Sequence, residues 1–297
     1  MSGVTEKDFM EIGFDMVNKH RFSNRKSYEA KAEEYKTHFG CKPCVAHAIW
    51  RNLLSTDIPE AKLDHGCEDP KRFLWAFHYL KKYPVETEFH GLYGMNRNDA
   101  REWIWYFLYK IAALRASVLA WPDEWTNKEK ELLISVDGIH FWTREPHASV
   151  PNRPFSKKNF SWKWNHAGVS YEIGVHLTES RIVWFSGPYP AGSTNDNGMY
   201  RQGGLAAKMK GNFALADNGY SHPTIAKRSS VDTERVKEFK KRALNRQESV
   251  NSRFRNFKCL SNQFRHDPKE KHLIVFTAAC VIVQFEIELD APLFDIY

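Results

Sequence analysis

The spacing of apolar residues changes near residue 125. Before it, apolar positions recur every three or four residues, as between Trp103 and Val118, which predicts helices. After residue 130 the chain has short runs of strand character, and Val169 to Leu177 alternates apolar and polar-facing positions. The sequence therefore predicts a helical region over residues 1–125. It predicts an α/β region with a mixed sheet flanked by helices over residues 126–297.

The helical region ends with a short helix, a turn at Gly94-Met95-Asn96 and a longer helix. Asn98 is the predicted N-cap of the longer helix, with Asp99 and Glu102 complementing the dipole of its first turn. This order gives the outline of a helix-turn-helix, and an ordinary helical hairpin fits it equally well.

In the second region, "LLISVDG", "GVSYEIGVHL" and "RIVWFSG" predict three strands, and "FALADNGY" predicts a short fourth. "GGLAAKMKG" predicts a short helix, and Asp232–Asn262 predicts one long charged helix. "HLIVFTAACVIVQFEIE" fits a helix or a strand. Because Thr277 and Gln284 interrupt this run, we expect it to be too short to cross a bilayer and predict no membrane partner.

Charge is concentrated in one segment. The whole chain has a net charge of +7, and residues 227–258 contain eleven Lys or Arg against four acids. A cationic helix of this kind is either a solvated face or a surface that binds a polyanion, where each phosphate contact releases counterions. Nucleic acid is the leading predicted partner. The absence of a secretory signal and the odd number of cysteines, five, predict a nuclear location in a eukaryote and a cytoplasmic one otherwise.

Two predicted strands each end on an aspartate that is followed closely by glycine. They are "LLISVD" at Asp137 and "FALAD" at Asp217. Such a pair is also ordinary turn chemistry. Glu248, an acid between Arg246 and Arg253 on the basic helix, adds a third carboxylate. If the three converge, divalent ions must neutralise them, and oxygen ligands suit Mg²⁺ or Mn²⁺. Two ions about 4 Å apart activate a water or 3′-hydroxyl and stabilise the leaving oxygen of a phosphodiester.

Four segments in order, "VDGIH", "SYEIGVHLTESRIVWFSGPYPAG", "LADNGY" and "RQESVNSRFRNFKCLSNQFRH", resemble the PIF/Harbinger superfamily of D-D-E transposases over about residues 130–285. The resemblance implies a ribonuclease-H-like core with a five-stranded mixed sheet whose first strand contains Asp137. It also implies metal-dependent cleavage and transfer of DNA strands. In that family a separate Myb-like protein often recognises the terminal repeats.

The resemblance leaves the second acid open. Asp196 lies where the superfamily shows an aspartate, whereas fold logic favours Asp217, because the second acid of this core follows the fourth strand. The chain also departs from the family pattern at Ile139, Asn195 and Phe254-Arg255, and none of these departures removes an acid.

The candidate DNA contacts include arginines whose guanidinium forks match phosphate oxygens. Lys163 lies between Trp162 and Trp164, where stacking on unpaired bases or plain strand packing would fit. Asn251, one turn after Glu248, is expected to orient a metal-bound water. The full set of predicted DNA contacts is Arg246, Asn251, Arg253, Arg255, Lys258 and Lys163.

Weaker candidates lie outside this set. Cys41 and Cys44 have zinc-like spacing, with His47 and Cys67 nearby, but no second such pair exists. His140 and His176 are either metal ligands or packed residues.

Three functions fit these observations. The first is a D-D-E transposase with Asp137, Asp217 and Glu248 on two metal ions, acting alone or as a homo-oligomer. The second is a catalytically inactive, host-adopted DNA- or protein-binding factor. The third, a hydrolase of small phosphoesters, needs neither the basic helix nor the helical region.

Overall fold

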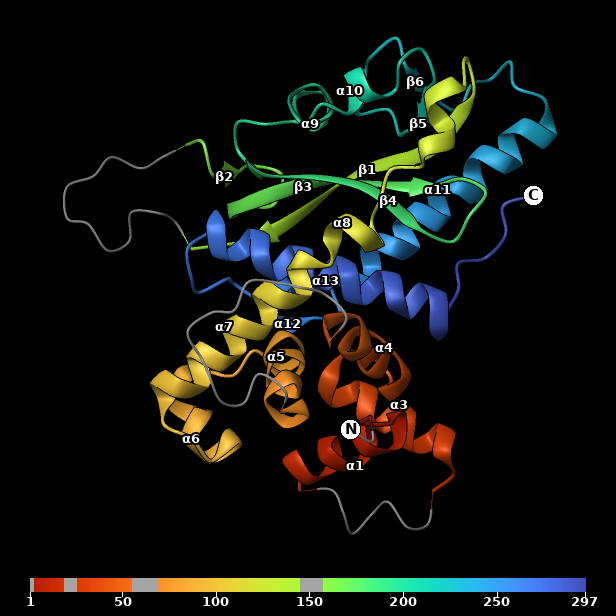
Figure 1. The fold of residues 1–297 in the computed structure, drawn as a ribbon. Helices are drawn as coiled ribbons and strands as arrows, with labels where there is room; N and C mark the ends of the chain where they lie inside the picture. The colour runs from red at the N-terminus through yellow and green to blue at the C-terminus, as the bar shows by residue number, and fades with distance from the viewer. Residues whose placement is uncertain (1–2, 19–25, 55–68, 145–156) are drawn as a thin grey trace. The chain divides into compact units, whose positions relative to one another are not determined.

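The computed structural model describes residues 3–18, 26–54, 69–144 and 157–297 (Figure 1). The chain divides into two compact units, each made from more than one segment. The helical unit contains Met1–Val118, Arg255–Leu260 and Ile274–Ala291. The sheet unit contains Leu119–Phe254, Ser261–Leu273 and Pro292–Tyr297.

The helical unit follows the predicted helical pattern. Its helices begin at side-chain caps such as Thr5, Ser27 and Asp69, which accept hydrogen bonds from backbone N–H groups of the first turn. Its elements are α1 (Glu6–Met16), α3 (Tyr28–Phe39), α4 (Pro43–Leu54), α5 (Pro70–Lys82), η1 (Glu86–Glu88), α6 (Phe89–Tyr93), α7 (Arg97–Ala113) and α8 (Arg115–Val118).

The short helix, turn and long helix expected near residue 94 are α6 and α7. Gly94 ends α6 with a φ of 68°, and the N-cap of α7 is Asn96, which accepts from the N–H groups of Asn98 and Asp99. The prediction of Asn98 as the cap was therefore wrong by two residues. Most of α7 between Ala100 and Ala112 is buried, so the helix has little exposed surface to place in a DNA groove.

The apolar segment whose structure the sequence left open is a helix, α13 (Glu270–Leu289). Near its C-terminal end, Lys36 pairs with Glu286 at 2.5 Å and Lys42 with Asp290 at 2.8 Å, both within the helical unit. The chain is therefore divided differently from the predicted boundary at residue 125, because a late segment belongs to the early helices.

Helix α13 is long and apolar enough to cross a membrane, contrary to our expectation from its sequence. However, 78% of its apolar window is buried inside the protein. Burial of this extent is typical of a helix in a protein core, and we interpret α13 in that way.

The sheet unit contains a six-stranded mixed sheet among the described residues, where we predicted five strands (Figure 1). The strand order is β2-β3-β1-β5-β6, and β4 also pairs with β3. Strand β3 runs antiparallel to β1 and β4, whereas β5 runs parallel to β1 and β6. The strands are β1 (Leu132–Trp142), β2 (Phe160–Ser161), β3 (His166–His176), β4 (Ile182–Pro190), β5 (Phe213–Leu215) and β6 (Ile225–Ala226).

Helices of the sheet unit pack on both faces of the sheet, as the alternation of side chains along β1 requires. Ile134 and Val136 point to one face and pack with Tyr200 and Leu205, near α9 and α10. Ser135 points to the other face and donates to Gln247 of α11. These helices are η2 (Asp123–Asn127), α9 (Asp196–Gln202), α10 (Leu205–Lys208) and α11 (Glu234–Phe254). The short α12 (Lys258–Ser261) that follows α11 lies mostly in the helical unit.

Two predicted boundaries were wrong. Strand β1 does not end at Asp137 but continues to Trp142, because β3 pairs with it along this whole length. The basic segment is not one helix over Asp232–Asn262, since α11 ends at Phe254 and the short α12 follows it.

Candidate functional site

Asp137 and Asp217 follow neighbouring parallel strands at the same level. The last paired residues of β1 and β5 are Ser135 and Leu215, and each aspartate comes two residues later. Beyond this pair β1 continues along β3, whereas β5 has ended. Asp137 therefore lies in the middle of β1, where β3 still pairs with one edge of the strand and β5 no longer pairs with the other.

Both carboxylate oxygens of Asp137 accept a hydrogen bond. Oδ1 accepts from the N–H of Gly138 at 2.8 Å, and Oδ2 accepts from Nδ2 of Asn251 at 2.8 Å. The pKa of Asp137 is raised to about 7, chiefly by burial and also by the negative charges of Asp217, Asp196 and Glu248, while the N–H of Gly138 acts to lower it. The two donated bonds do not neutralise this group, so the site has an excess of negative charge that a cation would relieve.

Asp196 is the first residue of α9, where Asn195 caps the helix by accepting from the N–H of Gly198 at 2.9 Å. Its carboxylate lies against two glycines. A Cβ atom at Gly138 would be 2.8 Å from Oδ1 of Asp196, and one at Gly219 would be 2.6 Å from Oδ2. Both positions therefore need glycine for this approach.

Asp196 belongs to the same acidic group as the two strand-end acids. Burial raises its pKa, the charge of Asp217 raises it further, and Lys163 lowers it. The structure thus brings both candidates for the second acid beside Asp137, and the choice between them stays a proposal.

Helix α11 approaches β1 through two buried polar side chains. Gln247 accepts from Oγ of Ser135 at 2.8 Å, and Asn251 donates to Asp137. Glu248 is exposed and lies one helical turn before Asn251, so it is on the side of α11 that faces Asp137. Its charge contributes to the raised pKa of Asp137.

The structure separates the predicted DNA contacts into two kinds. Arg246 is only 3% exposed, and its guanidinium donates to the backbone carbonyls of Leu177 and Glu179. This placement argues against a phosphate contact by Arg246. Asn251 is buried against Asp137, whereas the remaining candidates are exposed or half-buried: Lys163, Arg253, Arg255 and Lys258.

Glu172 is an acidic residue that our reading of the sequence missed. It lies opposite Gly138 on β3 and is fully buried. Nε1 of Trp184 donates to its Oε2 at 3.3 Å, while Oε1 has no hydrogen-bond partner. The pKa of Glu172 is raised to about 8, chiefly by burial and also by the charge of Asp196, while the bond from Trp184 acts to lower it. A lone acid within an otherwise apolar alternating strand was the signal for it.

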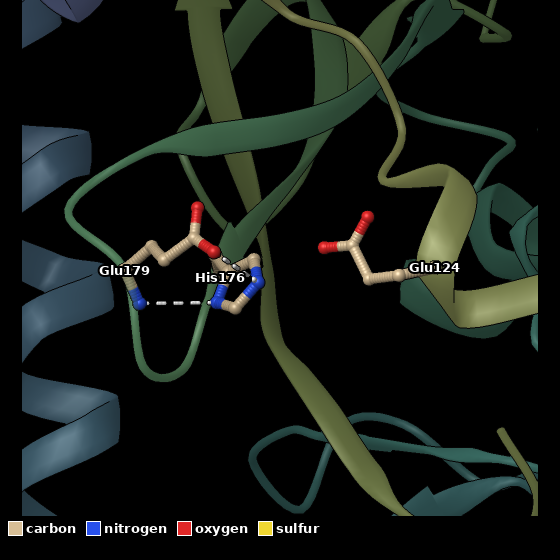
Figure 2. Close-up of side chains that lie close together, drawn as sticks. All are labelled: Glu124, His176 and Glu179. Atoms are coloured by element: carbon tan, nitrogen blue, oxygen red, sulfur yellow. Dashed lines mark hydrogen bonds and ion pairs between the residues drawn. The ribbon is translucent and has the colours of Figure 1, made fainter.

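Three other groups, Glu124, His176 and Glu179, have potential ligand atoms within 4.8 Å of one another (Figure 2). Nδ1 of His176 accepts from the backbone N–H groups of Thr178 and Glu179, both at 3.1 Å. The proton of the neutral ring is therefore on Nε2, which lies 3.6 Å from Oε1 of Glu179. Because a protonated Nε2 has no lone pair to offer, this group does not fit a metal ion, and we interpret His176 as a packed residue.

The candidate zinc site at Cys41 and Cys44 does not fit a metal ion either, as far as the described residues show. Cys41 is buried and Cys44 half-buried, and burial raises the pKa of both thiols. Zinc binds the thiolate, which these surroundings disfavour. Cys67 lies outside the described residues.

Comparison with known families decides the broad identity. Residues 136–284 match the family described as DDE superfamily endonuclease, and this match begins one residue before Asp137. The chain belongs to the DDE superfamily endonucleases. Comparisons with curated proteins and with solved structures gave no match.

Membership has three consequences for the site. A DDE endonuclease is a nuclease-like or transposase-like protein, its substrate class is DNA, and members of the family use divalent metal ions. The match extends over β1, the strands that flank it, α11 and most of α13. It therefore includes Asp137, Asp196, Asp217 and Glu248.

Proposed function

We propose that the chain is a PIF/Harbinger-type DDE transposase or endonuclease with a ribonuclease-H-like catalytic unit. Apart from the two-residue β2, the strands follow one another as β4-β3-β1-β5-β6, and β3 alone is antiparallel to the other four, which supports this core. The observation that supports catalysis most strongly is that Asp137 and Asp217 each follow the last pair of β1 and β5 by two residues, which places them side by side. A direct bond from Asn251 then joins Asp137 to the helix that contains Glu248.

In this proposal Asp137, Asp217 and Glu248 hold two Mg²⁺ or Mn²⁺ ions, with Asp196 as the alternative second acid. Burial and neighbouring acids raise the pKa of Asp137 and of Asp196, and a group of carboxylates in such surroundings is the donor set expected for hard divalent cations. When bound, the ions supply activation of a water or 3′-hydroxyl and stabilisation of the leaving oxygen.

The residues of the chain supply position. Asn251 and the N–H of Gly138 each occupy one oxygen of Asp137, which fixes the plane of that carboxylate. Gly138 and Gly219 leave room for the carboxylate of Asp196 beside the two strand-end acids. Arg253, Arg255, Lys258 and Lys163 then contact phosphates. A Myb-like partner, a homo-oligomer and a nuclear location in a eukaryote belong to this proposal through the family resemblance alone.

The alternative is a catalytically inactive, transposase-derived binding factor. The departures from the family pattern do not favour an inactive protein, because the residues found at these positions serve the fold. Ile139 is buried, Asn195 caps α9, and Phe254 is buried at the end of α11. All four candidate acids are retained, so we favour the active enzyme.

The test is Mg²⁺-dependent strand cleavage by the full chain on a DNA duplex. Asp217→Asn, Glu248→Gln and Asp196→Asn are compared with Glu238→Gln, an exposed position on the same helix α11. We expect the first two to lose at least a hundredfold in rate and the control to keep the parent rate. If Asp196→Asn loses activity while Asp217→Asn keeps the parent rate, the second acid is Asp196. If the parent binds DNA but shows no cleavage with either metal ion, the binding factor is the correct function.

A further inference from the structure

Three tryptophans expose their rings at one corner of the sheet. The exposed fractions are 41% for Trp142, 76% for Trp162 and 45% for Trp164. The last two lie at the tip of a hairpin, because Ser161 of β2 pairs with His166 of β3 and leaves residues 162–165 as the connection. Large exposed aromatic rings cost solvation free energy and are characteristic of binding surfaces.

One of these rings, that of Trp164, stacks on His140. The ring of His140 is parallel to that of Trp164, with centroids 5.7 Å apart and an interplanar angle of 1°, and it also stacks on His166 at 5.0 Å. Gly168 makes this possible, since a Cβ atom there would collide with the His140 ring. The ammonium of Lys163 lies 5.4 Å from the centroid of Trp164, within the range of a cation–π contact.

The hairpin lies close to the acidic residues. His140 is two residues beyond Gly138 on the same face of β1, a distance of about 7 Å along a strand. Gly138 in turn contacts the carboxylate of Asp196. The base of the hairpin is bonded to the loop that leads to Asp196, because the N–H of Gly192 donates to the carbonyl of Lys158 at 2.9 Å.

We infer that Trp162, Lys163 and Trp164 form a stacking site for an unpaired nucleobase of the DNA strand whose phosphate lies at the acidic residues. This inference rests on the proposed function. Inside a duplex the faces of a base are covered by its neighbours, so only a base at a strand end or an extruded base can stack on a protein ring. The ammonium of Lys163, beside the Trp164 ring, complements the phosphate of the same nucleotide.

Charge favours DNA over a protein partner at this surface. The pKa of His140 is lowered to about 4, chiefly by burial and also by the neighbouring His166 and Lys163, so its ring is neutral at physiological pH. Lys163 is then the cation of the hairpin tip, and its charge lowers the pKa of Asp196. A flat neutral platform with one ammonium beside it matches a nucleobase with its phosphodiester.

The experiment measures binding of two duplexes to the full chain in chelator, so that catalysis plays no part. One duplex contains a bulged, unpaired 2-aminopurine, and the other has the same sequence fully paired. We expect the parent to prefer the bulged duplex. Trp164→Ala should weaken its binding about five- to hundredfold, from the stacking free energy of one base, and leave the paired duplex within about twofold.

Matched variants separate stacking from other effects. Trp164→Phe should retain most of the preference, and Trp162→Ala should reproduce the loss. Phe294→Ala, which removes a ring of equal exposure, 45%, elsewhere in the sheet unit, should change nothing. Equal weakening for both duplexes, or no weakening, would overturn the stacking site. A parent that binds both duplexes equally overturns it as well while leaving the proposed function intact. A parent that binds neither duplex overturns both.

Discussion

Nδ2 of Asn251 lies 2.8 Å from Oδ2 of Asp137 and joins helix α11 to the middle of strand β1. These two residues are 114 positions apart in the chain, and their bond brings the helix of Glu248 over the strand of Asp137. Asn251 is 8% exposed, so the bond is shielded from water. This contact orients the carboxylate to which all the other acids couple.

Replacing Asn251 with Ala should therefore damage both stability and activity. The change leaves a buried acceptor without its donor, which costs about 1–3 kcal/mol of unfolding free energy. Urea denaturation measures this loss, and Asn245→Ala, at an exposed position on the same helix, is the control. Cleavage should fall at least tenfold in the first variant only. Equal stability of the two variants would show that the bond to Asp137 has no energetic role.

Glu172→Gln should stabilise the protein at neutral and alkaline pH. The folded pKa of Glu172 is about 8 against an ordinary value of 4.5, so between these values the folded state keeps a proton that the unfolded state has lost. The contribution of this group to the unfolding free energy is complete below pH 4.5 and is lost as the pH rises from there through 8. At pH 7 the loss relative to pH 4.5 amounts to roughly 3 kcal/mol.

Gln does not titrate, so the unfolding free energy of Glu172→Gln should depend less on pH across this window. Denaturant melts in chelator at a series of pH values measure the slope, with the exposed Glu238→Gln as control. A slope that matches the parent's would mean that Glu172 is already ionised in the folded protein.

Arg246→Met should destabilise the protein and leave its affinity for DNA unchanged. The guanidinium is buried and donates to two backbone carbonyls, which would lose their donors, at a cost of about 2–4 kcal/mol. Arg235→Met, at an exposed position on the same helix, should cost little. Stability and DNA affinity are measured on both variants. A drop in affinity without a drop in stability would restore Arg246 as a DNA contact.

The triple replacement of Arg253, Arg255 and Lys258 with Ala should weaken DNA binding for all sequences alike. Each lost phosphate contact should reduce the slope of log affinity against log salt by about 0.9. Fluorescence anisotropy over a salt series measures the slope. A control variant removes three exposed cations of the helical unit: Lys7, Arg51 and Lys71. If both triple variants change the slope equally, the effect is one of net charge and not of a specific surface.

Local pattern was enough to predict the main strands and the two aspartates on or just after them, although β1 continues beyond Asp137. Val169 to Leu177 alternates along β3, and "FALAD" ends on Asp217 as a short buried strand does. The adjacency of Asp137 and Asp217 is a consequence of parallel pairing, which the order of the elements already implied.

Other features depend on partners that are distant in the chain. Strand β1 continues beyond Asp137 because β3 pairs with it. The register of this pairing makes Glu172 the cross-strand neighbour of Gly138. In the sequence nothing distinguishes Arg246 from the exposed basic residues near it. Its side chain is buried because it donates hydrogen bonds to the carbonyls of Leu177 and Glu179. The helical state of α13 and its ion pairs with Lys36 and Lys42 depend on the same kind of distant contact.

Thermal denaturation of Asp137→Asn in chelator shows whether the half-buried Asp137 lies among other acids to hold a metal ion. The folded pKa of Asp137 is about 7 against an ordinary 3.8, so above pH 7 its charge destabilises the metal-free protein. At pH 8 without metal, the variant should be as stable as the parent or more stable, by about 1–4 kcal/mol. Added Mg²⁺ should raise the melting temperature of the parent alone. A clear loss of stability in chelator would contradict the account, because it would mean that Asp137 is a structural residue held by its hydrogen bonds.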